Sequence, residues 1–396
     1  MFDQLTALPA DPLLGLITAF KNDPRSTKVD LGVGVYRDET GHTPIMSAIK
    51  KATMLHMESE DTKTYISPGG VPGFVEGIKK LVLSNTSSAL ADNRVAGLQT
   101  PGGCGALRIG AELLMRMKGD LTVWLSDPTW ANHVPLLKSA GLKLATYPYF
   151  DSKTGAVDFE AMDATLAKLG PTDIVLIHGC CHNPTGADLT YEQWQRVTER
   201  AVKQGFIPFV DVAYQGLGDG LDDDVKGLRL LSENVDEMLI ATSCSKNFGL
   251  YRERTGSLLV QTKNADQANT VITHVQDAAR ASYSMSPAYG GYLVDLVLHD
   301  AALRTEWENE INAMALRVKS LREGLLQCIQ QKDIEKDFSF ITAQKGMFTY
   351  LGLTQAQVHR LRDEYAIYMA DSSRINVAGL NTHCLDYVAD SIKAVL

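Results

Sequence analysis

The middle half of the chain alternates short apolar runs with helical patterns, and this alternation restricts the fold more than any other feature. The apolar runs predict strands at Thr122–Leu125, Leu144–Pro148, Asp173–His178, Ile207–Asp211, Met238–Thr242 and Ser257–Gln261. The segments between them predict helices at Ala106–Met117, Phe159–Leu169, Tyr191–Gln204 and Asp266–Tyr283. Short apolar strands separated by helices are typical of a mainly parallel sheet that is covered on both faces. The sequence therefore predicts an α/β domain.

A second, smaller α/β unit is expected after Asp300, since a chain of 396 residues usually divides into two domains. The pattern there predicts a long helix over Glu306–Gln331, strand-like stretches at Phe338–Ile341 and Met347–Leu351, and then further helices. We expect an N-terminal arm with part of the small domain at residues 1–44, a large domain at 45–312 and the small domain at 313–396.

Composition and charge argue against several classes of partner. With 38 basic and 47 acidic side chains the net charge is -9, which disfavours nucleic acid as the main partner. The N-terminus has no secretory pattern, and no apolar run approaches the roughly 18 residues of a membrane span. The six cysteines show no paired zinc spacing. We therefore expect a cytoplasmic protein with reduced thiols, no structural or catalytic metal and no membrane partner.

Polar residues that directly follow the predicted strands are the candidates for chemistry, because ligands bind at the carboxyl ends of strands in open α/β sheets. Asn183 follows one strand, Asp211 ends the next with Tyr214 just beyond it, and Lys246 follows a third. A lysine that forms a Schiff base needs a fixed position and a partly desolvated amine. A carboxylate such as Asp211 could hold a pyridinium nitrogen protonated. The structural alternatives are an exposed loop lysine, a capping aspartate and an asparagine in a tight turn.

The segment TPGGCGALR places glycines before a helical pattern, where free backbone N–H groups could bind a phosphate. Such turns are common in proteins without a phosphate ligand, and the segment lacks the lysine of a nucleotide-binding loop. Arg280 ends a predicted helix and Arg374 follows a strand-like stretch. Each is suited to bidentate recognition of a carboxylate, or is a surface cation.

Taken together, the sequence resembles the class I aminotransferases of the aspartate and aromatic amino acid branch, over nearly the whole chain. The matching segments are DPLLGL, LGVGVYRDETGHTP, TKTYISPGG, TPGGCGALR, SDPTWANH, HGCCHNPTG, DVAYQG, SCSKNFGLYRERTG, RASYSMSP and RINVAGL. The resemblance implies the fold-type I architecture of enzymes that use pyridoxal 5′-phosphate, with a large mainly parallel sheet domain and a smaller α/β domain. It also implies a homodimer whose active sites are shared across the interface.

The resemblance implies a role for each matching residue. Lys246 would form the Schiff base with the cofactor, Asp211 would pair with its ring nitrogen, and Tyr214 and Asn183 would bind its phenolic oxygen. The remaining cofactor-binding positions are Trp130, stacked on the ring, and the phosphate-binding Gly103, Cys104, Ser243, Ser245, Arg254 and, from the partner subunit, Tyr65. The substrate-binding positions are Gly34, Trp130, Asn183, Arg280 and Arg374. His133, and with it His178, would support Asp211 from behind, although a buried structural histidine is nearly as good an account of either.

The expected reaction is a ping-pong transamination, in which aromatic amino acids, aspartate and glutamate give their amino group to 2-oxoglutarate or oxaloacetate. Two departures from the family pattern bear on this. Cys104 stands where the family usually has Ser or Thr, and a thiol is a weaker hydrogen-bond donor. Met285 stands where aspartate-specific relatives tend to have Asn, which favours aromatic substrates. A strict aspartate aminotransferase, a lyase or β-decarboxylase of the same fold, and a non-catalytic cofactor-binding regulator are the alternatives.

Overall fold

The computed structural model describes residues 2–8, 12–117 and 119–396, and Asp11 of the DPLLGL segment lies outside them. The chain forms two compact units. Unit 1 consists of residues 1–43, 317–343 and 347–396, and unit 2 of residues 44–316 and 344–346. In the part of the chain that the structure describes, no helix is long and apolar enough to span a membrane.

Unit 2 contains a sheet that has seven strands among the described residues. In spatial order these are β2 (Val95–Pro101), β10 (Thr255–Gln261), β9 (Met238–Ser243), β8 (Ile207–Val212), β7 (Asp173–His178), β3 (Thr122–Asp127) and β4 (Lys143–Pro148). Only β10 runs antiparallel to its neighbours β2 and β9, and the other pairs are parallel. The predicted mainly parallel α/β sheet is therefore confirmed.

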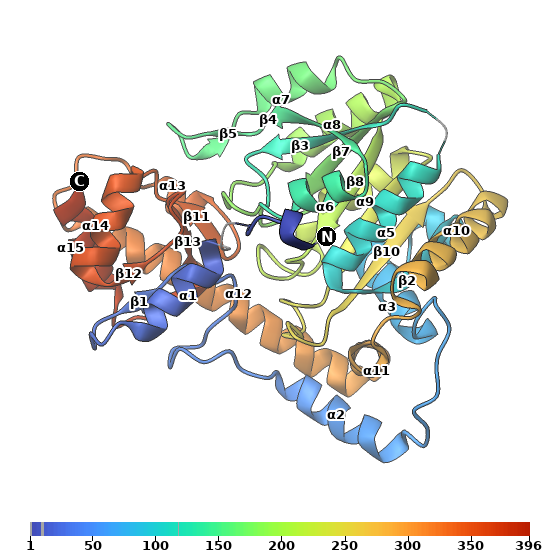
Figure 1. Ribbon diagram of the computed structural model, residues 1–396, viewed down its shortest axis with the longest axis horizontal. Coiled ribbons are helices and arrows are strands. Elements are labelled where there is room, and N and C mark those ends of the chain that lie inside the picture. Colours follow the sequence, from blue (N-terminus) through green and yellow to red (C-terminus); the bar gives the residue numbers. More distant parts are fainter. Residues whose placement is uncertain (1, 9–11, 118) are drawn as a thin grey trace. The chain divides into compact units, whose positions relative to one another are not determined.

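Helices cover both faces of this sheet (Figure 1). The helices packed on one face are α5 (Gly102–Arg116), α6 (His133–Ser139) and α10 (Ala265–Tyr283). Those on the other are α3 (Pro72–Leu83), α7 (Phe159–Leu166), α8 (Tyr191–Gln204) and α9 (Lys226–Asn234). Unit 2 also contains α2 (Ser47–Ser59), α4 (Ser88–Ala91), α11 (Ala288–His299) and the hairpin of β5 (Phe150–Asp151) and β6 (Ala156–Val157).

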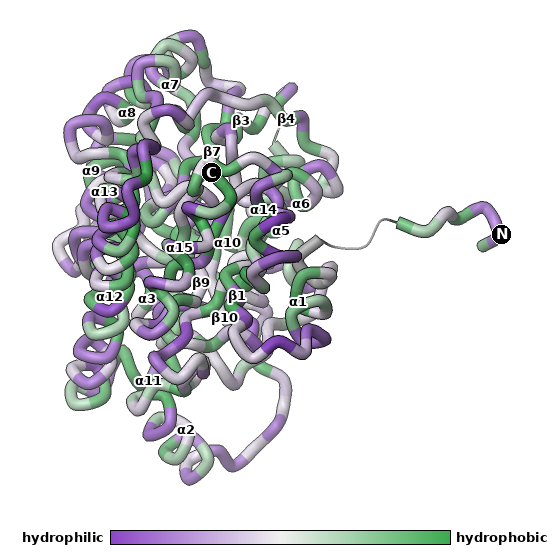
Figure 2. The backbone as a smooth tube through the Cα atoms, turned by 90° about the vertical axis from the view of Figure 1, so that its left-hand side faces the viewer, coloured by the Kyte–Doolittle hydropathy of each residue, from purple (hydrophilic) through white to green (hydrophobic). Residues whose placement is uncertain are grey.

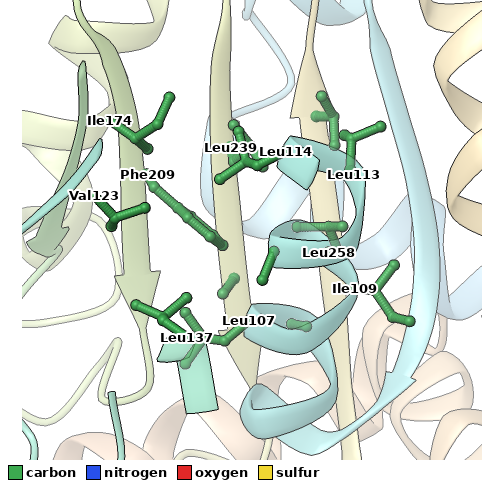
Figure 3. Close-up of a cluster of buried hydrophobic side chains, with 14 of the residues drawn as sticks. Leu107, Ile109, Leu113, Leu114, Val123, Leu137, Ile174, Phe209, Leu239 and Leu258 are labelled. Carbon is green, nitrogen blue, oxygen red and sulfur yellow. The ribbon is translucent and has the colours of Figure 1, made fainter. Parts of the chain in front are cut away.

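The main core of unit 2 lies between the sheet and helices α5, α6 and α10. Leu107 and Leu114 of α5 pack there against Phe209 of β8 and Leu258 of β10 (Figure 3). Burying a side chain of this size contributes roughly 1.5–3 kcal/mol, so the core fixes the strands whose ends carry the polar candidates.

Local signals in the sequence explain where helices begin and end. Thr190 and Gln193 form a reciprocal capping box at the start of α8, and Gly205 ends that helix in a left-handed conformation. The same type of capping box, from Thr354 and Gln357, opens α14 (Gln355–Tyr365). The predicted bounds Tyr191–Gln204 are therefore confirmed to the residue.

Unit 1 is built from short strands and helices. It pairs β1 (Val29–Asp30) in parallel with β12 (Ile367–Tyr368), and β11 (Phe348–Tyr350) antiparallel with β13 (Arg374–Asn376). Its helices are α1 (Pro12–Asn22), α13 (Phe340–Ala343), α14 and α15 (Leu385–Val395), with a single turn at Val377–Gly379.

The long helix α12 (Ala301–Gln330) begins in unit 2 and ends in unit 1. Along it, hydrophilic and hydrophobic residues alternate (Figure 2), as in a helix that buries one side. The prediction of a strand-like stretch at Phe338–Ile341 was wrong, because α13 begins at Phe340. The strand predicted at Met347–Leu351 is confirmed as β11.

Candidate active site

The candidate residues of unit 2 meet at the carboxyl ends of its parallel strands. Trp130 follows β3, Asn183 follows β7, Asp211 is the penultimate residue of β8, and Lys246 follows β9. Each of these strands is parallel to its neighbour within the set, so their ends share one edge of the sheet. The sheet register thus brings together side chains that are far apart in the sequence.

Lys246 is only partly exposed, and its amine lies 4.8 Å from the centre of the Tyr214 ring. Burial lowers the pKa of Lys246 below its ordinary value, although the negative charge of Asp211 opposes this shift. The positive charge of Arg254 adds to the lowering. A lysine with a lowered pKa has more of its neutral, nucleophilic form near neutral pH.

Asp211 is buried, and its Oδ2 lies 3.1 Å from Nε2 of His133. Burial is the largest single influence and by itself would raise the pKa of this carboxyl. The hydrogen bond with His133 and electrostatic attraction from neighbouring groups, among them Lys246, together outweigh burial, so the pKa lies below its ordinary value. Asp211 is therefore a carboxylate held in a low-dielectric position, where a cation or a protonated ring nitrogen is its natural partner.

A series of hydrogen bonds leads from Asn183 to Asp211, and each donor in it can be assigned. The backbone N–H of Asn183 donates to Nδ1 of His178 at 3.2 Å, so the proton of a neutral His178 is on Nε2, 3.3 Å from the Thr129 hydroxyl. That hydroxyl accepts from His178 and donates its own proton to Nδ1 of His133, 2.8 Å away. His133 is then left with a proton on Nε2, which it donates to Asp211. This series of hydrogen bonds fixes the tautomers of both His178 and His133.

Burial keeps His178 neutral, since it lowers the pKa of this histidine to about 3. The ring of His182 is tilted against that of His178, with ring centres 4.2 Å apart, and burial lowers the pKa of His182 well below the ordinary value too. His182 and Thr129 were not singled out in the sequence. Thr129 lies four residues before His133 in the SDPTWANH segment, but no local pattern shows that its hydroxyl joins two histidines.

Asn183 and Tyr214 lie side by side, with Nδ2 of Asn183 3.4 Å from the tyrosine hydroxyl. Both side chains are buried, and Oδ1 of Asn183 has no hydrogen-bond partner among the described residues. An unsatisfied buried polar atom costs roughly 1–3 kcal/mol, so this pair is suited to a polar ligand group.

A group of hydrogen-bond donors lies where α5 begins and β9 ends. Oγ of Ser243 is 3.1 Å from Oγ of Ser245, which is 3.4 Å from Nη1 of Arg254. Gly102 has φ +71°, and a Cβ on it would lie 2.5 Å from Nη2 of Arg254. The free N–H groups of the first turn of α5, including Gly103, add to this positive region. Ser243, Ser245, Arg254 and the N–H groups at the start of α5 together form a donor cradle that is suited to an anion.

Cys104 and Trp130 border these groups. Cys104 is in the first turn of α5, and its Sγ lies 3.6 Å from Nδ2 of Asn132. Trp130 packs partly against the core and meets His133 edge to face, with ring centres 5.2 Å apart.

Two predicted residues of unit 2 are exposed. Tyr65 is 86% exposed, and Arg280, in the last turn of α10, is exposed as well. Within the described residues neither side chain forms a hydrogen bond or an ion pair. The expected roles of both depend on a second chain and stay predictions.

Unit 1 contains the other two predicted substrate-binding residues. Arg374 is buried, its Nη2 donates to the carbonyl oxygen of Gly32 at 2.6 Å, and its guanidinium lies 4.6 Å from the centre of the Phe348 ring. A Cβ on Gly34 would lie 2.9 Å from Cζ of that ring. Glycine at this position therefore leaves the Phe348 ring free to hold Arg374 in place.

Comparison with known proteins identifies the family. The model of aminotransferase classes I and II matches residues 26–392. The chain belongs to the class I and II aminotransferase family. It is 45% identical to an aspartate aminotransferase of Haemophilus influenzae, over the full length of both chains. An aromatic-amino-acid aminotransferase of Pseudomonas aeruginosa is 42% identical, with 100% of this chain and 98% of that protein covered.

The fold of this aminotransferase agrees with that of solved relatives. The crystal structure of an aromatic-amino-acid aminotransferase from Burkholderia pseudomallei, covalently bound to pyridoxal phosphate, superposes with a TM-score of 0.98 at 42% identity. The superposition covers 100% of this chain and 99% of that one. The predicted family and fold class are therefore confirmed.

Proposed function

We propose that this aminotransferase uses pyridoxal phosphate, held on Lys246, to exchange amino groups between aromatic or acidic amino acids and 2-oxoglutarate or oxaloacetate. One observation carries the proposal. A partly buried lysine with a lowered pKa lies close enough to a buried carboxylate, Asp211, and to Arg254 of the donor cradle for the charges of both to shift its pKa.

The residues present fit the cofactor. Its phosphate is an anion, and the cradle offers the hydroxyls of Ser243 and Ser245, the guanidinium of Arg254 and the N–H groups at the start of α5. Its ring nitrogen is a base, and Asp211 offers it a buried carboxylate. Its phenolic oxygen accepts hydrogen bonds, and Asn183 with Tyr214 offers an amide and a hydroxyl.

Pyridoxal phosphate, when bound, supplies an electron sink for the bonds at the substrate Cα. The carboxylate of Asp211 would hold a proton at the ring nitrogen, and the hydrogen bond from His133 helps to keep that carboxylate charged. Nζ of Lys246 would hold the cofactor and, as a free amine, would take the proton from the substrate Cα. Trp130 would cover the ring and restrict the access of water.

For the substrate, we propose that Arg374 binds the α-carboxylate with help from the backbone at Gly34, and that Arg280 of the partner chain binds a side-chain carboxylate. Relatives named for aspartate and for aromatic amino acids are nearly equally similar, at 45% and 42% identity. Met285 favours aromatic substrates. A strict aspartate aminotransferase is the second candidate, because the Haemophilus influenzae relative has that name.

The proposal includes a homodimer. Around α2, unit 2 exposes large apolar side chains, of which Met57 is 71% and Met54 66% exposed, close in sequence to Tyr65. Apolar side chains gathered on one surface are typical of a protein interface. A second copy that covers α2 would place Tyr65 in contact with another chain.

The test is spectroscopic. Addition of glutamate to the holoenzyme should convert the visible absorption of the lysine-bound cofactor to that of its amine form, and addition of 2-oxoglutarate should reverse the change. A lyase or a regulator would not complete this cycle. The values of kcat/KM for Asp, Glu, Tyr, Phe and Trp then separate dual specificity from a strict aspartate aminotransferase.

A further inference from the structure

Two adjacent cysteines and an aspartate form a buried cluster in unit 2 that the roles proposed above do not use. Among the described residues, one ligand atom each from Cys180, Cys181 and Asp224 lie within 4.8 Å of one another. The three side chains are 5%, 1% and 8% exposed. Both cysteines are free thiols.

The backbone turns sharply to make this cluster. Neighbouring residues of an extended chain point to opposite sides, whereas Cys181 has φ +50°, a left-handed conformation in which both sulfurs face the same region. For a residue other than glycine this conformation costs about 1–2 kcal/mol. Strain of this kind persists where the surroundings enforce it, and it is frequent at functional sites.

Glycines keep the space beside the sulfur of Cys181 open. A Cβ on Gly218 would lie 3.2 Å from that sulfur and 2.5 Å from Oδ1 of Asp224. A Cβ on Gly346, where φ is +70°, would lie 2.7 Å from the same sulfur. The sulfur and Oδ1 therefore face each other across Gly218.

Asp224 is held rigidly and retains one free acceptor position. Its Oδ2 accepts from the backbone N–H groups of Gly216 and Gly218, at 2.8 and 3.0 Å. Its Oδ1 accepts from the N–H of Asp219 at 2.7 Å. A carboxylate has about four lone-pair positions, two on each oxygen, so Oδ1 can take one further partner.

A pocket of about 330 Å³ reaches the cluster and is lined by both Cys180 and Asp224. Lys226 and Lys345 also line it, but their ammonium groups form ion pairs with Asp223 and Asp219. The pocket gives an ion a route to Cys180 and Asp224 and leaves room for a water molecule beside them.

We propose that Cys180, Cys181 and Asp224 bind one thiophilic divalent cation of the Zn²⁺ or Cd²⁺ type per chain. Two thiolates and a carboxylate supply three positions of a tetrahedron, and a water in the pocket takes the fourth. On binding, the two S–H protons leave to solvent and the ion gives up its other waters. The ion would join the segment that leads to Asn183 with the loop that follows Tyr214.

The test uses Cd²⁺ as the probe on the reduced holoenzyme. Equilibrium dialysis should find one tightly bound ion per chain, with ultraviolet thiolate-to-cadmium absorption. X-ray absorption at the cadmium edge should show two sulfur neighbours, a result that needs no variant. Cys180→Ser and Cys181→Ser should each weaken binding at least about tenfold and reduce the absorption, in line with loss of one thiolate ligand. The matched control Cys328→Ser, on α12, should bind Cd²⁺ like the wild type.

The proposal is overturned if the wild type binds no stoichiometric Cd²⁺, or if the bound ion has one sulfur neighbour or none. It is also overturned if both single variants bind as the wild type does. Asp224→Asn is a further check, because it keeps both sulfurs. It should weaken the affinity while the thiolate absorption remains, and unchanged affinity would remove Asp224 from the ligand set.

Discussion

At the scale of single residues, the chemistry depends on how the surroundings change the charge of each group. Burial lowers the pKa of Lys246. Burial would raise the pKa of Asp211, but the hydrogen bond from His133 and electrostatic attraction from neighbouring groups together hold that pKa below its ordinary value. Two groups in the same small region are therefore shifted toward the forms that catalysis needs, a neutral amine and a charged carboxylate.

Lys246→Ala removes the amine that we propose anchors the cofactor and moves the proton. The variant should retain the cofactor through the phosphate cradle, and turnover should fall by a factor on the order of a thousand or more. Steady-state kinetics and the absorption spectrum of the purified protein measure both effects. Lys263→Ala, which changes an exposed lysine on the same unit, is the control. Near-normal turnover in Lys246→Ala would remove the central proposal.

Cys104→Ser replaces a weak donor by a stronger one at the start of α5. If the thiol faces the phosphate, the added hydrogen bond should stabilise the bound cofactor by about 0.5–1.5 kcal/mol and slow its release several-fold. The release rate is measured by dilution of the holoenzyme into an agent that traps free cofactor, with Cys328→Ser as the control. Faster release from Cys104→Ser would show that the side chain points elsewhere.

At the scale of elements, the ends of β3, β7 and β8 are joined by the chain of hydrogen bonds from Asn183 through His178, Thr129 and His133 to Asp211. Thr129 is the one member with a hydroxyl, and it accepts from one histidine while it donates to the other. The tautomers of His178 and His133 therefore depend on residues at all three strand ends.

Thr129→Val removes that hydroxyl at nearly constant volume. His133 then loses the donor that fixes its tautomer, and a buried histidine nitrogen is left without a partner at a cost of roughly 1–3 kcal/mol. We expect kcat to fall about tenfold, and the nitrogen NMR signals of His133 should show a mixture of tautomers. Thr129→Ser keeps the hydroxyl and should behave like the wild type. An unchanged tautomer in Thr129→Val would mean that Asp211 alone orients His133.

Much of the sheet could be predicted because its strands are continuous apolar runs, and Asp173–His178 agrees to the residue. Strand β2 was not predicted, since its sequence VAGLQTP interrupts the apolar run with Gly97, Gln99 and Thr100. Helix α13 was predicted as a strand because four residues are too few for a helical period. Its conformation also depends on a distant contact, the hydrogen bond from Arg322 to the carbonyl oxygen of Ile341.

The candidate site, like the fold, contains parts that could be predicted from the sequence and parts that could not. The polar residues after β7, β8 and β9 could be located because strand ends in a parallel sheet share an edge, and the structure brings Asn183, Tyr214 and Lys246 together. The partners of Thr129 could not be predicted, since they depend on the distance between loops that follow different strands. Nor could the cluster of Cys180, Cys181 and Asp224, which requires a left-handed turn at Cys181.

At the scale of the whole molecule, stability should depend on pH through the buried histidines. The pKa of His178 is about 3 in the folded protein against 6.5 for an ordinary histidine. Above pH 6.5 neither state binds the proton, and below it only the unfolded state does, so stability is lost as the pH falls. Between pH 7 and pH 5 this group alone should lower the free energy of unfolding by about 2 kcal/mol.

Urea denaturation of the holoenzyme at both pH values measures this loss. The glutamine in His178→Gln cannot bind a proton. This variant should be less stable than the wild type at pH 7, but between pH 7 and pH 5 its free energy of unfolding should fall by about 2 kcal/mol less than that of the wild type. His42, which is exposed, provides the control variant His42→Gln, whose pH dependence should match that of the wild type. Equal losses in the wild type and in His178→Gln would show that His178 takes up a proton in the folded protein.

The side chains of Tyr65 and Arg280 are exposed, and their proposed functions require the association of two chains. In the proposed dimer, Arg280 would decide the substrate range. Every amino acid has an α-carboxylate, but only aspartate and glutamate bring a second one that needs a cation. Arg280→Leu should lower kcat/KM for aspartate roughly a hundredfold or more, in line with about 3–5 kcal/mol for a buried charge left unpaired. The value of kcat/KM for phenylalanine should change less than about tenfold, because an aromatic ring loses only packing against the arginine methylenes.

Arg280→Lys keeps the charge without the planar fork, so its kcat/KM for aspartate should lie between the values of the wild type and of Arg280→Leu. If Arg280→Leu loses both substrates equally, Arg280 has a structural role. If the wild type does not use phenylalanine at all, the enzyme is a strict aspartate aminotransferase.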